Sequence, residues 1–144
     1  MKKQNKILLI IHCLCFASVM MHAQTVDSLS AKEIYSLYFS SGSPSNIPII
    51  DGRDSSMFMS GHIKYAFYCD AYSKTAHECV VPLLLADTVI VYCTTHRRSL
   101  TIIEILGQKY SYNGHIIFMS DGIQAWKSHS FPLENYIEAS YKTD

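Results

Sequence analysis

The sequence predicts an α/β domain built on a mainly parallel sheet that is flanked by helices on both faces. Short apolar segments rich in β-branched residues alternate along the chain with segments whose apolar residues recur at helical spacing. Strands that alternate with helices form parallel sheets covered on both faces. The chain has 144 residues, of which 49% are hydrophobic and 17% charged, and it contains no repeat or low-complexity tract. One compact core is therefore expected.

The first element predicted after the N-terminal segment is a helix that starts near Ser30. Ser30 and Glu33 have the spacing of a capping box, and helical periodicity continues to about Phe39. A polar loop at residues 40–46 ends this helix. The elements predicted next are a buried strand at 47–51, a short helix and turn at 55–63, a short strand at 65–69 and a helix at 77–85.

The second half of the chain has the clearest alternation. The predicted elements are a strand at 88–93, a helix at 98–110, a strand at 115–119 and a helix at 122–129. Cys93 ends the strand TVIVYC and lies immediately before a helix. Ligands of parallel sheets bind beyond the carboxyl ends of the strands, so Cys93 is predicted to lie where a site is expected.

The first 23 residues have the layout of a secretory signal peptide. A basic start, MKKQNK, precedes a mainly apolar stretch of 15 residues, ILLIIHCLCFASVMM, which His12 interrupts, and Ala23 supplies a small residue for cleavage. The alternative is an N-terminal membrane anchor, but the apolar stretch is shorter than the about 20 residues that span a bilayer. We expect export to the periplasm or the exterior, with residues 24–144 as the mature domain and no stable membrane insertion after cleavage.

Loss of this segment changes the charge and the cysteine count. Three of the 12 basic residues lie in it, so 9 basic and 12 acidic residues remain, a net charge of −3. No basic stripe is present, and we expect no nucleic-acid partner. The remaining cysteines are Cys69, Cys79 and Cys93. Cys69 and Cys79 either pair with each other, or one of them resolves an oxidised or persulfidated Cys93.

The loop that follows Cys93 combines a nucleophile with cations. Free N–H groups at a helix start, the helix dipole and two guanidinium groups all favour negative charge there. That charge can be a thiolate, a persulfide or a substrate oxyanion. A structural alternative is a buried cysteine that acts as a small apolar residue, beside arginines on a solvated face. The candidate site consists of Cys93 as nucleophile and of substrate-binding residues Thr94, Thr95, His96, Arg97, Arg98 and Ser99.

Four motifs in chain order resemble the rhodanese family of sulfurtransferases. They are Asp51-Gly52-Arg53, Gly61-His62-Ile63 with Ala66, Val89 to Cys93 with Arg98-Ser99, and Asp121-Gly122-Ile123 with Trp126. The resemblance covers about residues 30–133. It implies a single rhodanese-like domain on a mainly parallel five-stranded sheet.

The resemblance also implies an activity. Cys93 takes a sulfane sulfur from a small anionic donor such as thiosulfate, holds it as a persulfide and passes it to cyanide or a thiol. Arg98 and the loop amides hold the sulfur, while Arg97 and His96 attract the donor. Asp51 and Arg53 are expected to hold the strand end and neighbouring loops by hydrogen bonds, with a direct catalytic role as the alternative. No cofactor is expected, and the tyrosines and remaining histidines show no metal-ligand spacing, so no metal is expected either. The four residues between Cys93 and Arg98 favour sulfur transfer over the related phosphatases and arsenate reductases, which have five.

The sequence departs from the family pattern where glycine is common, at His96, Tyr65 and Asp121. A side chain at a position that requires positive φ costs of order 1 kcal/mol. Two alternatives to a sulfurtransferase therefore remain open. One is a catalytically weak rhodanese-like module that binds a partner or carries sulfur, and the other is a thiol–disulfide redox protein that uses Cys69 or Cys79.

Overall fold

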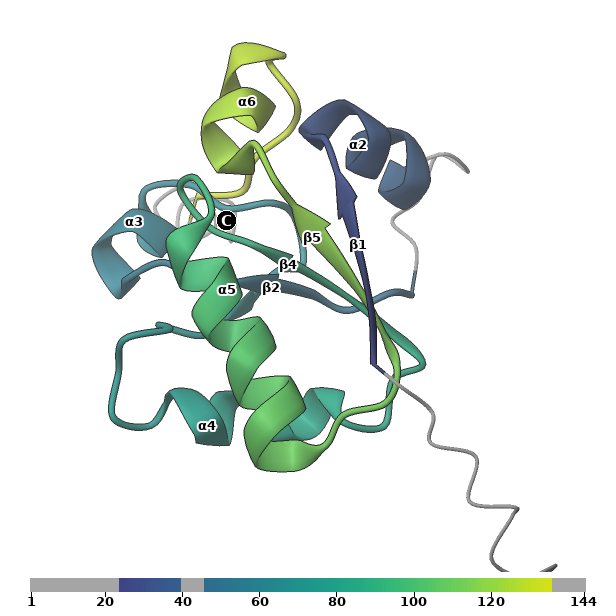
Figure 1. Cartoon of the computed structure of the whole chain (residues 1–144). Helices are drawn as coiled ribbons and strands as arrows, with labels where there is room; N and C mark the ends of the chain where they lie inside the picture. The colour runs from purple at the N-terminus through teal and green to yellow at the C-terminus, as the bar shows by residue number, and fades with distance from the viewer. Residues whose placement is uncertain (1–23, 40–45, 136–144) are drawn as a thin grey trace, which may run out of the picture.

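The computed structural model describes residues 24–39 and 46–135 (Figure 1). The predicted signal peptide lies outside the described residues, as does the predicted loop apart from its last residue. In chain order, the elements are β1 (Thr25–Leu29), α2 (Ala31–Phe39), β2 (Ile49–Asp51), α3 (Ser55–Met59), β3 (Phe67–Tyr68), α4 (Ala76–Cys79), η2 (Val81–Leu83), β4 (Thr88–Tyr92), α5 (Arg97–Glu104), η3 (Ile105–Lys109), β5 (His115–Met119) and α6 (Gly122–Ser128).

The five strands form one sheet in the order β1-β5-β4-β2-β3. Every neighbouring pair is parallel, which confirms the parallel five-stranded α/β fold that the sequence and the resemblance predict. The carboxyl ends of all strands meet at one edge of a parallel sheet. Because β4 is the central strand, the residue that follows it lies in the middle of that edge.

Helices cover both faces of the sheet (Figure 1). Successive strand residues point to opposite faces, so neighbouring residues enter different cores. The core under α2 and α6 contains Ile34, Ile49, Ile90, Ile117, Met119, Ile123 and Trp126. The core under α5 and the α4–η2 segment contains Ile50, Val80, Leu83, Val89, Val91, Ile102, Leu106 and Ile116.

The capping box predicted at the start of α2 is present. The Glu33 carboxylate accepts from the Ser30 N–H at 2.8 Å, and the Glu33 N–H donates to the Ser30 hydroxyl at 3.3 Å. The hydrogen bonds that the Glu33 carboxylate accepts from the Ser30 N–H and the Ser30 hydroxyl lower the pKa of Glu33. The helix start is therefore held by local contacts, which explains why its sequence alone predicts it.

The strand β1 is not among the elements that the sequence predicts. Its segment TVDSL is exposed apart from the half-buried Leu29, so it lacks the apolar alternation of a half-buried strand. Parallel pairing with β5 at the edge of the sheet holds β1 in place. This pairing joins residues about 90 positions apart, and no local pattern predicts it.

The predicted strand at 65–69 is too long, because β3 contains only Phe67–Tyr68. Tyr65 has a φ of 62°, in the left-handed region that interrupts a strand. The Ala66 N–H donates to the Ile63 carbonyl at 2.9 Å and closes a turn. Tyr65 thus keeps the backbone conformation of the glycine that is common there, with a large side chain in its place.

Two predicted helices also differ in detail. The segment 77–85 is not one helix: it divides into α4 and the 3₁₀ turn η2, which contains Pro82. Proline has no N–H to donate within an α-helix, so the regular hydrogen-bond pattern stops there. The helix predicted at 98–110 begins one residue earlier, at Arg97, and its last turn, η3, is π-helical.

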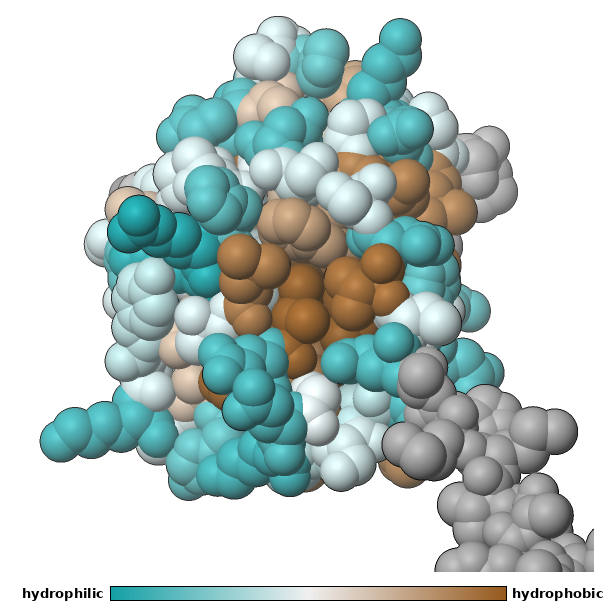
Figure 2. Space-filling model, in the orientation of Figure 1, coloured by the Kyte–Doolittle hydropathy of each residue, from teal (hydrophilic) through white to brown (hydrophobic). Residues whose placement is uncertain are grey.

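One part of the α5 face is apolar and open to solvent. Val26 on β1 and Leu100 on α5 are about half exposed, and Figure 2 shows brown, apolar side chains gathered beside α5 on this face.

Among the described residues, no helix has the length and hydropathy required to cross a membrane.

Candidate active site

Cys93 is the first residue after β4, at the middle of the carboxyl edge of the sheet. It is 2% exposed. Its carbonyl accepts the Ile123 N–H of α6 at 2.9 Å, which ties the start of the loop to the neighbouring helix. The structure therefore places the predicted nucleophile in a fixed position, directly before the loop that enters α5.

Cys93 is also the free cysteine of the described residues, since Cys69 and Cys79 form a disulfide. The Cα atoms of the two bridged residues are 5.6 Å apart. Of the two possibilities predicted for Cys69 and Cys79, the structure has the disulfide between them. Because both sulfurs are in this bond, neither residue has a free thiol with which to resolve an oxidised or persulfidated Cys93.

The loop packs against α6 through Gly122. This residue has a φ of 65°, and a Cβ atom there would lie 2.7 Å from the Thr94 carbonyl carbon and 2.8 Å from the Thr95 Cα. Glycine is required at this position because φ is positive and because the loop leaves no space for a Cβ atom. The preceding Asp121 has a φ of −93°, which any residue adopts, and its carboxylate accepts the Ala31 N–H at 2.9 Å. Aspartate in place of glycine is accommodated at this position and joins α6 to α2.

His96 does not strain the loop. Its φ is −150°, outside the left-handed region, so the cost considered for a histidine at this position does not arise. Thr95, His96 and Arg97 are exposed, and Thr94 is half-buried. Four of the predicted substrate-binding residues therefore form the mouth of the loop, above the buried Cys93.

Arg98 is held in place by its surroundings. Its Nη2 donates to the Asp54 carboxylate at 3.2 Å, and its Nη1 lies 3.7 Å from the Met57 sulfur. The guanidinium also lies over the Tyr72 ring, 5.2 Å from the ring centroid. Arg97 is therefore exposed to solvent, as the structural alternative expects of both arginines. Arg98 is not, because it is partly buried and has protein partners.

Asp54 connects Arg98 to α3. Its carboxylate accepts from the Ser56 hydroxyl at 2.7 Å and from the Met57 N–H at 3.0 Å, and so caps the helix. These hydrogen bonds, together with the charge of Arg98, lower the pKa of Asp54. Asp54 consequently stays ionised to lower pH than an ordinary aspartate and keeps the partner of Arg98 charged.

Two buried donors in the first turn of α5 have no acceptor among the described residues. They are the hydroxyl of Ser99, which is fully buried, and the Nε of Arg98. Buried donors without acceptors are rare and call for an explanation. Both belong to the helix start that the loop enters, where backbone N–H groups also face outward. A thiolate, a persulfide or a bound anion can supply the acceptor that this region lacks.

A buried network lies beneath the loop. The Arg53 guanidinium donates to Asp51 at 2.6 to 3.0 Å and to the Gly61 carbonyl at 2.7 Å. The Tyr92 hydroxyl donates to Asp51 at 2.8 Å and accepts the Ile63 N–H at 3.1 Å. Burial, and then the negative charge of Asp51, raise the pKa of Tyr92 well above its ordinary value. The network joins β2, β4 and the 61–63 turn.

This network faces the interior and not the mouth of the loop. Asp51 and Arg53 are 0% and 2% exposed, and they use their charged atoms on each other and on neighbouring groups. Their charged atoms are therefore occupied by each other and by groups at the strand ends. Their predicted supporting role fits this geometry.

The sequence does not predict three residues that contact the loop, namely Asp54, Met57 and Tyr72. Asp54 has a weak local signal, because aspartate before Ser55-Ser56 is a good helix cap. Met57 and Tyr72 meet Arg98 from more than 20 positions away. Nothing in the local sequence predicts those contacts.

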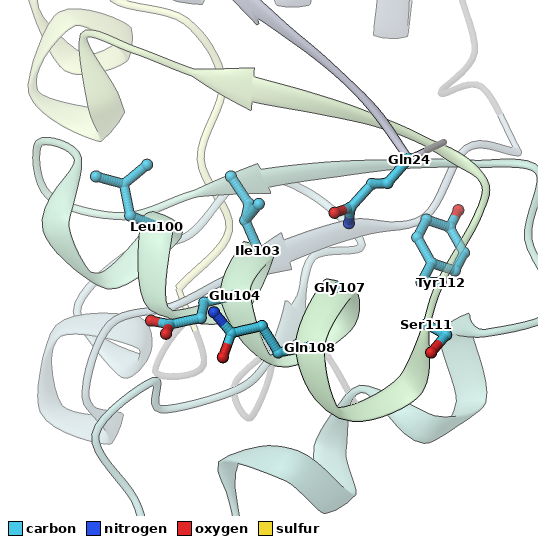
Figure 3. A pocket seen from close by; sticks show the side chains of 8 residues that line it. All are labelled: Gln24, Leu100, Ile103, Glu104, Gly107, Gln108, Ser111 and Tyr112. Carbon is cyan, nitrogen blue, oxygen red and sulfur yellow. The ribbon is translucent and has the colours of Figure 1, made fainter. Parts of the chain in front are cut away.

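A groove elsewhere on the surface is not part of this site. It has a volume of about 480 Å³ and lies between the start of β1 and the α5–η3 helix (Figure 3). Its lining includes Gln24, Leu100, Ile103 and Gln108, and none of the predicted site residues. The candidate site is instead identified from the residues of the loop between Cys93 and Ser99.

The site thus consists of a buried cysteine that directly follows the central strand of a parallel α/β sheet and of a cationic helix start. Comparison with known families identifies the class: the rhodanese-like domain model matches residues 30–129. The chain therefore belongs to the rhodanese-like domain family. A comparison with the sequences of curated proteins gives no match.

Solved structures have the same fold. The rhodanese-like domain of an Anabaena protein matches with a TM-score of 0.60 and 21% identity, over 81% of this chain and 85% of that chain. A thiosulfate sulfurtransferase from Pseudomonas aeruginosa matches with a TM-score of 0.58 and 21% identity, over 76% of this chain and 20% of that chain. A Rhodopseudomonas palustris protein of unknown function, described as a possible tyrosine phosphatase, matches with a TM-score of 0.56 and 22% identity, over 76% of this chain and 85% of that chain.

Proposed function

We propose that this protein is a sulfurtransferase that moves a sulfane sulfur from a small anionic donor such as thiosulfate to a thiophilic acceptor, with Cys93 as the persulfide-forming nucleophile. One observation carries the proposal: a buried free thiol lies at the start of a loop that enters a helix, and the first turn of that helix has two buried donors for which the described part of the chain supplies no acceptor. Such a site favours a negatively charged sulfur.

The reaction has two steps. The Cys93 thiolate attacks the sulfane sulfur of thiosulfate, the S–S bond of the donor breaks, and sulfite leaves with the bonding electrons. A persulfide anion remains on Cys93. Cyanide then attacks the outer sulfur through carbon, the persulfide S–S bond breaks, and thiocyanate and the Cys93 thiolate form. Charge and atoms balance in both steps, and neither step needs an oxidant or a cofactor.

The loop residues have distinct roles in this reaction. The helix-start amides, Ser99 and Arg98 stabilise the outer sulfur, because a fixed set of donors does not have to reorganise as charge moves onto it. Arg97 and His96 at the mouth attract the dianionic donor. The spacing of four residues between Cys93 and Arg98 favours a sulfur over a tetrahedral phosphate, so sulfur transfer ranks above phosphatase activity.

The proposal includes export of the protein. The disulfide between Cys69 and Cys79 supports it, because disulfides persist in oxidising compartments. The expected mature chain begins at Gln24 after cleavage of the signal peptide. Intact mass of the protein recovered from the periplasm or the medium tests this, and a cell-retained chain that still starts at Met1 would contradict it.

The activity is tested with the mature chain, residues 24–144, in a thiosulfate:cyanide assay beside Cys93→Ser. Intact mass after thiosulfate treatment is measured in parallel. Turnover together with a gain of about 32 Da, both lost in the variant, would support sulfur transfer at Cys93. Added mass without turnover would identify a sulfur carrier. No added mass and no turnover would overturn the proposal in favour of a binding module.

A further inference from the structure

The segment between Cys69 and Cys79 has little packing of its own. It consists of turns and the short helix α4, its residues 72–75 are exposed, and the side chains of Ala71 and Ala76, which it buries, are small. A segment with few buried apolar contacts opens locally at low free energy. The disulfide between Cys69 and Cys79 joins the two ends of the segment and so restricts this opening.

Tyr72 extends from this segment to the active loop. Its ring lies over the Arg98 guanidinium, 5.2 Å from the ring centroid, within the range of a cation–π contact. Tyr72 is 62% exposed, so burial in a core does not hold the ring there. Instead, the Tyr72 N–H donates to the Asp70 carboxylate at 3.0 Å, and the Ala71 N–H donates to the Gly52 carbonyl at 3.2 Å. The position of the ring therefore depends on the conformation of the segment that the disulfide closes.

Gly52 lies between this segment and α5. Its carbonyl accepts the Ala71 N–H, and a Cβ atom at Gly52 would lie 3.5 Å from the Cβ of Arg98. Arg98 thus has the segment near both ends of its side chain, through Gly52 at the Cβ atom and through Tyr72 at the guanidinium. A displacement of the segment therefore changes the surroundings of Arg98.

The position of the Arg98 guanidinium matters for the reaction because most of its contacts are with the protein. Nη2 donates to Asp54, Nη1 lies near the Met57 sulfur, and one face lies against the Tyr72 ring. Nε is buried and has no acceptor in the described part of the chain, so it remains as a donor for an anionic sulfur in the site. A donor that is already in place stabilises developing charge without a cost of reorganisation.

We propose that Tyr72 is a positioning residue for sulfur transfer, and that the Cys69–Cys79 disulfide acts on the reaction by holding Tyr72 over Arg98. This inference rests on the proposed sulfurtransferase function and adds a positioning residue and a controlling bond to the same site. The ring restricts the guanidinium to one place. Without the ring, the Arg98 side chain has more conformations, and its Nε donor is in place for a smaller fraction of the time.

The disulfide makes the formation of the Cys93 persulfide sensitive to reduction. A dithiol reductant supplies two electrons and two protons: the Cys69–Cys79 S–S bond breaks, both residues become thiols, and the dithiol becomes a disulfide. The backbone hydrogen bonds of the segment then have to hold Tyr72 without the covalent link. Cys93 is a free thiol before and after this exchange, so reduction changes the surroundings of the nucleophile and not the nucleophile itself.

The test measures persulfide formation in a single turnover, from the release of sulfite at saturating thiosulfate. Tyr72→Ala should lower this rate constant about two- to fivefold, the effect of losing an exposed cation–π contact. The thiosulfate concentration at half-maximal rate should change less, because the ring acts through Arg98 and not on the donor. Tyr72→Phe keeps the ring and should retain the rate.

The disulfide is tested in two ways. The double variant Cys69→Ala/Cys79→Ala should lose rate to the same extent as Tyr72→Ala, and so should the wild-type protein after reduction with a dithiol and removal of the dithiol by gel filtration. Addition of Tyr72→Ala to the double variant should lower the rate no further, because both changes act through one contact. Leu85→Ala is the matched control, since Leu85 is 96% exposed and lies outside the segment, and it should leave the rate unchanged.

Three results would overturn the inference: a wild-type rate in Tyr72→Ala, a wild-type rate in the reduced protein, or independent losses that multiply in the combined variant. In each case, sulfur loading of the wild-type protein leaves the sulfurtransferase proposal standing. Absence of sulfite release and of added sulfur in the wild-type protein would instead reject the proposed function, and this inference with it.

Discussion

The Tyr92 hydroxyl joins the central strand to the Asp51–Arg53 ion pair through a side-chain hydrogen bond. It donates to the Asp51 carboxylate at 2.8 Å and accepts the Ile63 N–H at 3.1 Å. Tyr92→Phe removes this oxygen and leaves the ring in place. The Ile63 N–H then loses its acceptor in a region where Tyr92 and Ile63 are both 0% exposed and water cannot replace it.

The expected cost follows from these two contacts. A hydrogen bond to a charged group contributes about 1.5–3 kcal/mol, and a buried donor left without an acceptor costs about 1–3 kcal/mol. Asp51 keeps its hydrogen bonds from Arg53, which limits the loss on its side. Tyr92→Phe should therefore lower the free energy of unfolding by about 2–4 kcal/mol.

Urea denaturation followed by circular dichroism measures this value. For a slope m of about 2 kcal/mol per molar urea, the midpoint should fall by about 1–2 M. Tyr112→Phe is the matched control, because the Tyr112 hydroxyl makes one neutral hydrogen bond, to the Ala86 carbonyl at 2.7 Å. Its expected cost is about 1 kcal/mol. Equal losses for the two variants would refute the argument that the Tyr92 hydroxyl supports a buried charge and an otherwise unpaired amide.

Three further predictions concern the loop, the backbone and alkaline pH. Arg97→Ala should raise the KM for thiosulfate about two- to fivefold and lower kcat less, because an exposed cation attracts the donor without contacting the reacting sulfur; an unchanged KM contradicts this role. Tyr65→Gly should be about 1 kcal/mol more stable than Tyr65→Ala, since both variants lose the Lys64 contact and only glycine adopts a φ of 62° without cost. Equal melting temperatures of the two variants would show that this position is not strained. The raised pKa values of the buried Tyr92 and Tyr112 mean that, above pH of about 10, the unfolded chain binds fewer protons than the folded one, so stability should fall as pH rises further. The fall should be shallower in Tyr92→Phe, and an identical slope in equilibrium unfolding would contradict the assignment to Tyr92.

The strands of the sheet differ in how well the local sequence pattern predicts them. The strands β2, β4 and β5 lie between apolar residues on both faces, so their sequences are continuously apolar and predict them directly. The edge strands are different. β1 has polar and exposed residues, and β3 is short because Tyr65 leaves the extended conformation before it begins. An edge strand pairs with only one neighbouring strand, so its sequence need not be continuously apolar. Their existence depends on pairing partners that are distant in the chain.

The candidate site divides in the same way. Cys93 to Ser99 are consecutive, so their common location at a helix start follows from the order of strand, loop and helix. The backbone of the loop does not follow from it. His96 is unstrained because its φ is −150°, and the local sequence does not predict that angle.

The sequence by itself determined the α/β class, the central strands and the loop that carries Cys93, because these depend on apolar periodicity and on neighbours in the chain. Tertiary structure alone decided the pairing of Cys69 with Cys79 and the contacts of Arg98 with Asp54, Met57 and Tyr72. The contacts of Arg98 join segments that are far apart in the chain, and the sequence does not show that these segments are close in space. Only the crossovers between parallel strands, which bring the carboxyl ends of β2, β3 and β4 to one edge, place them together.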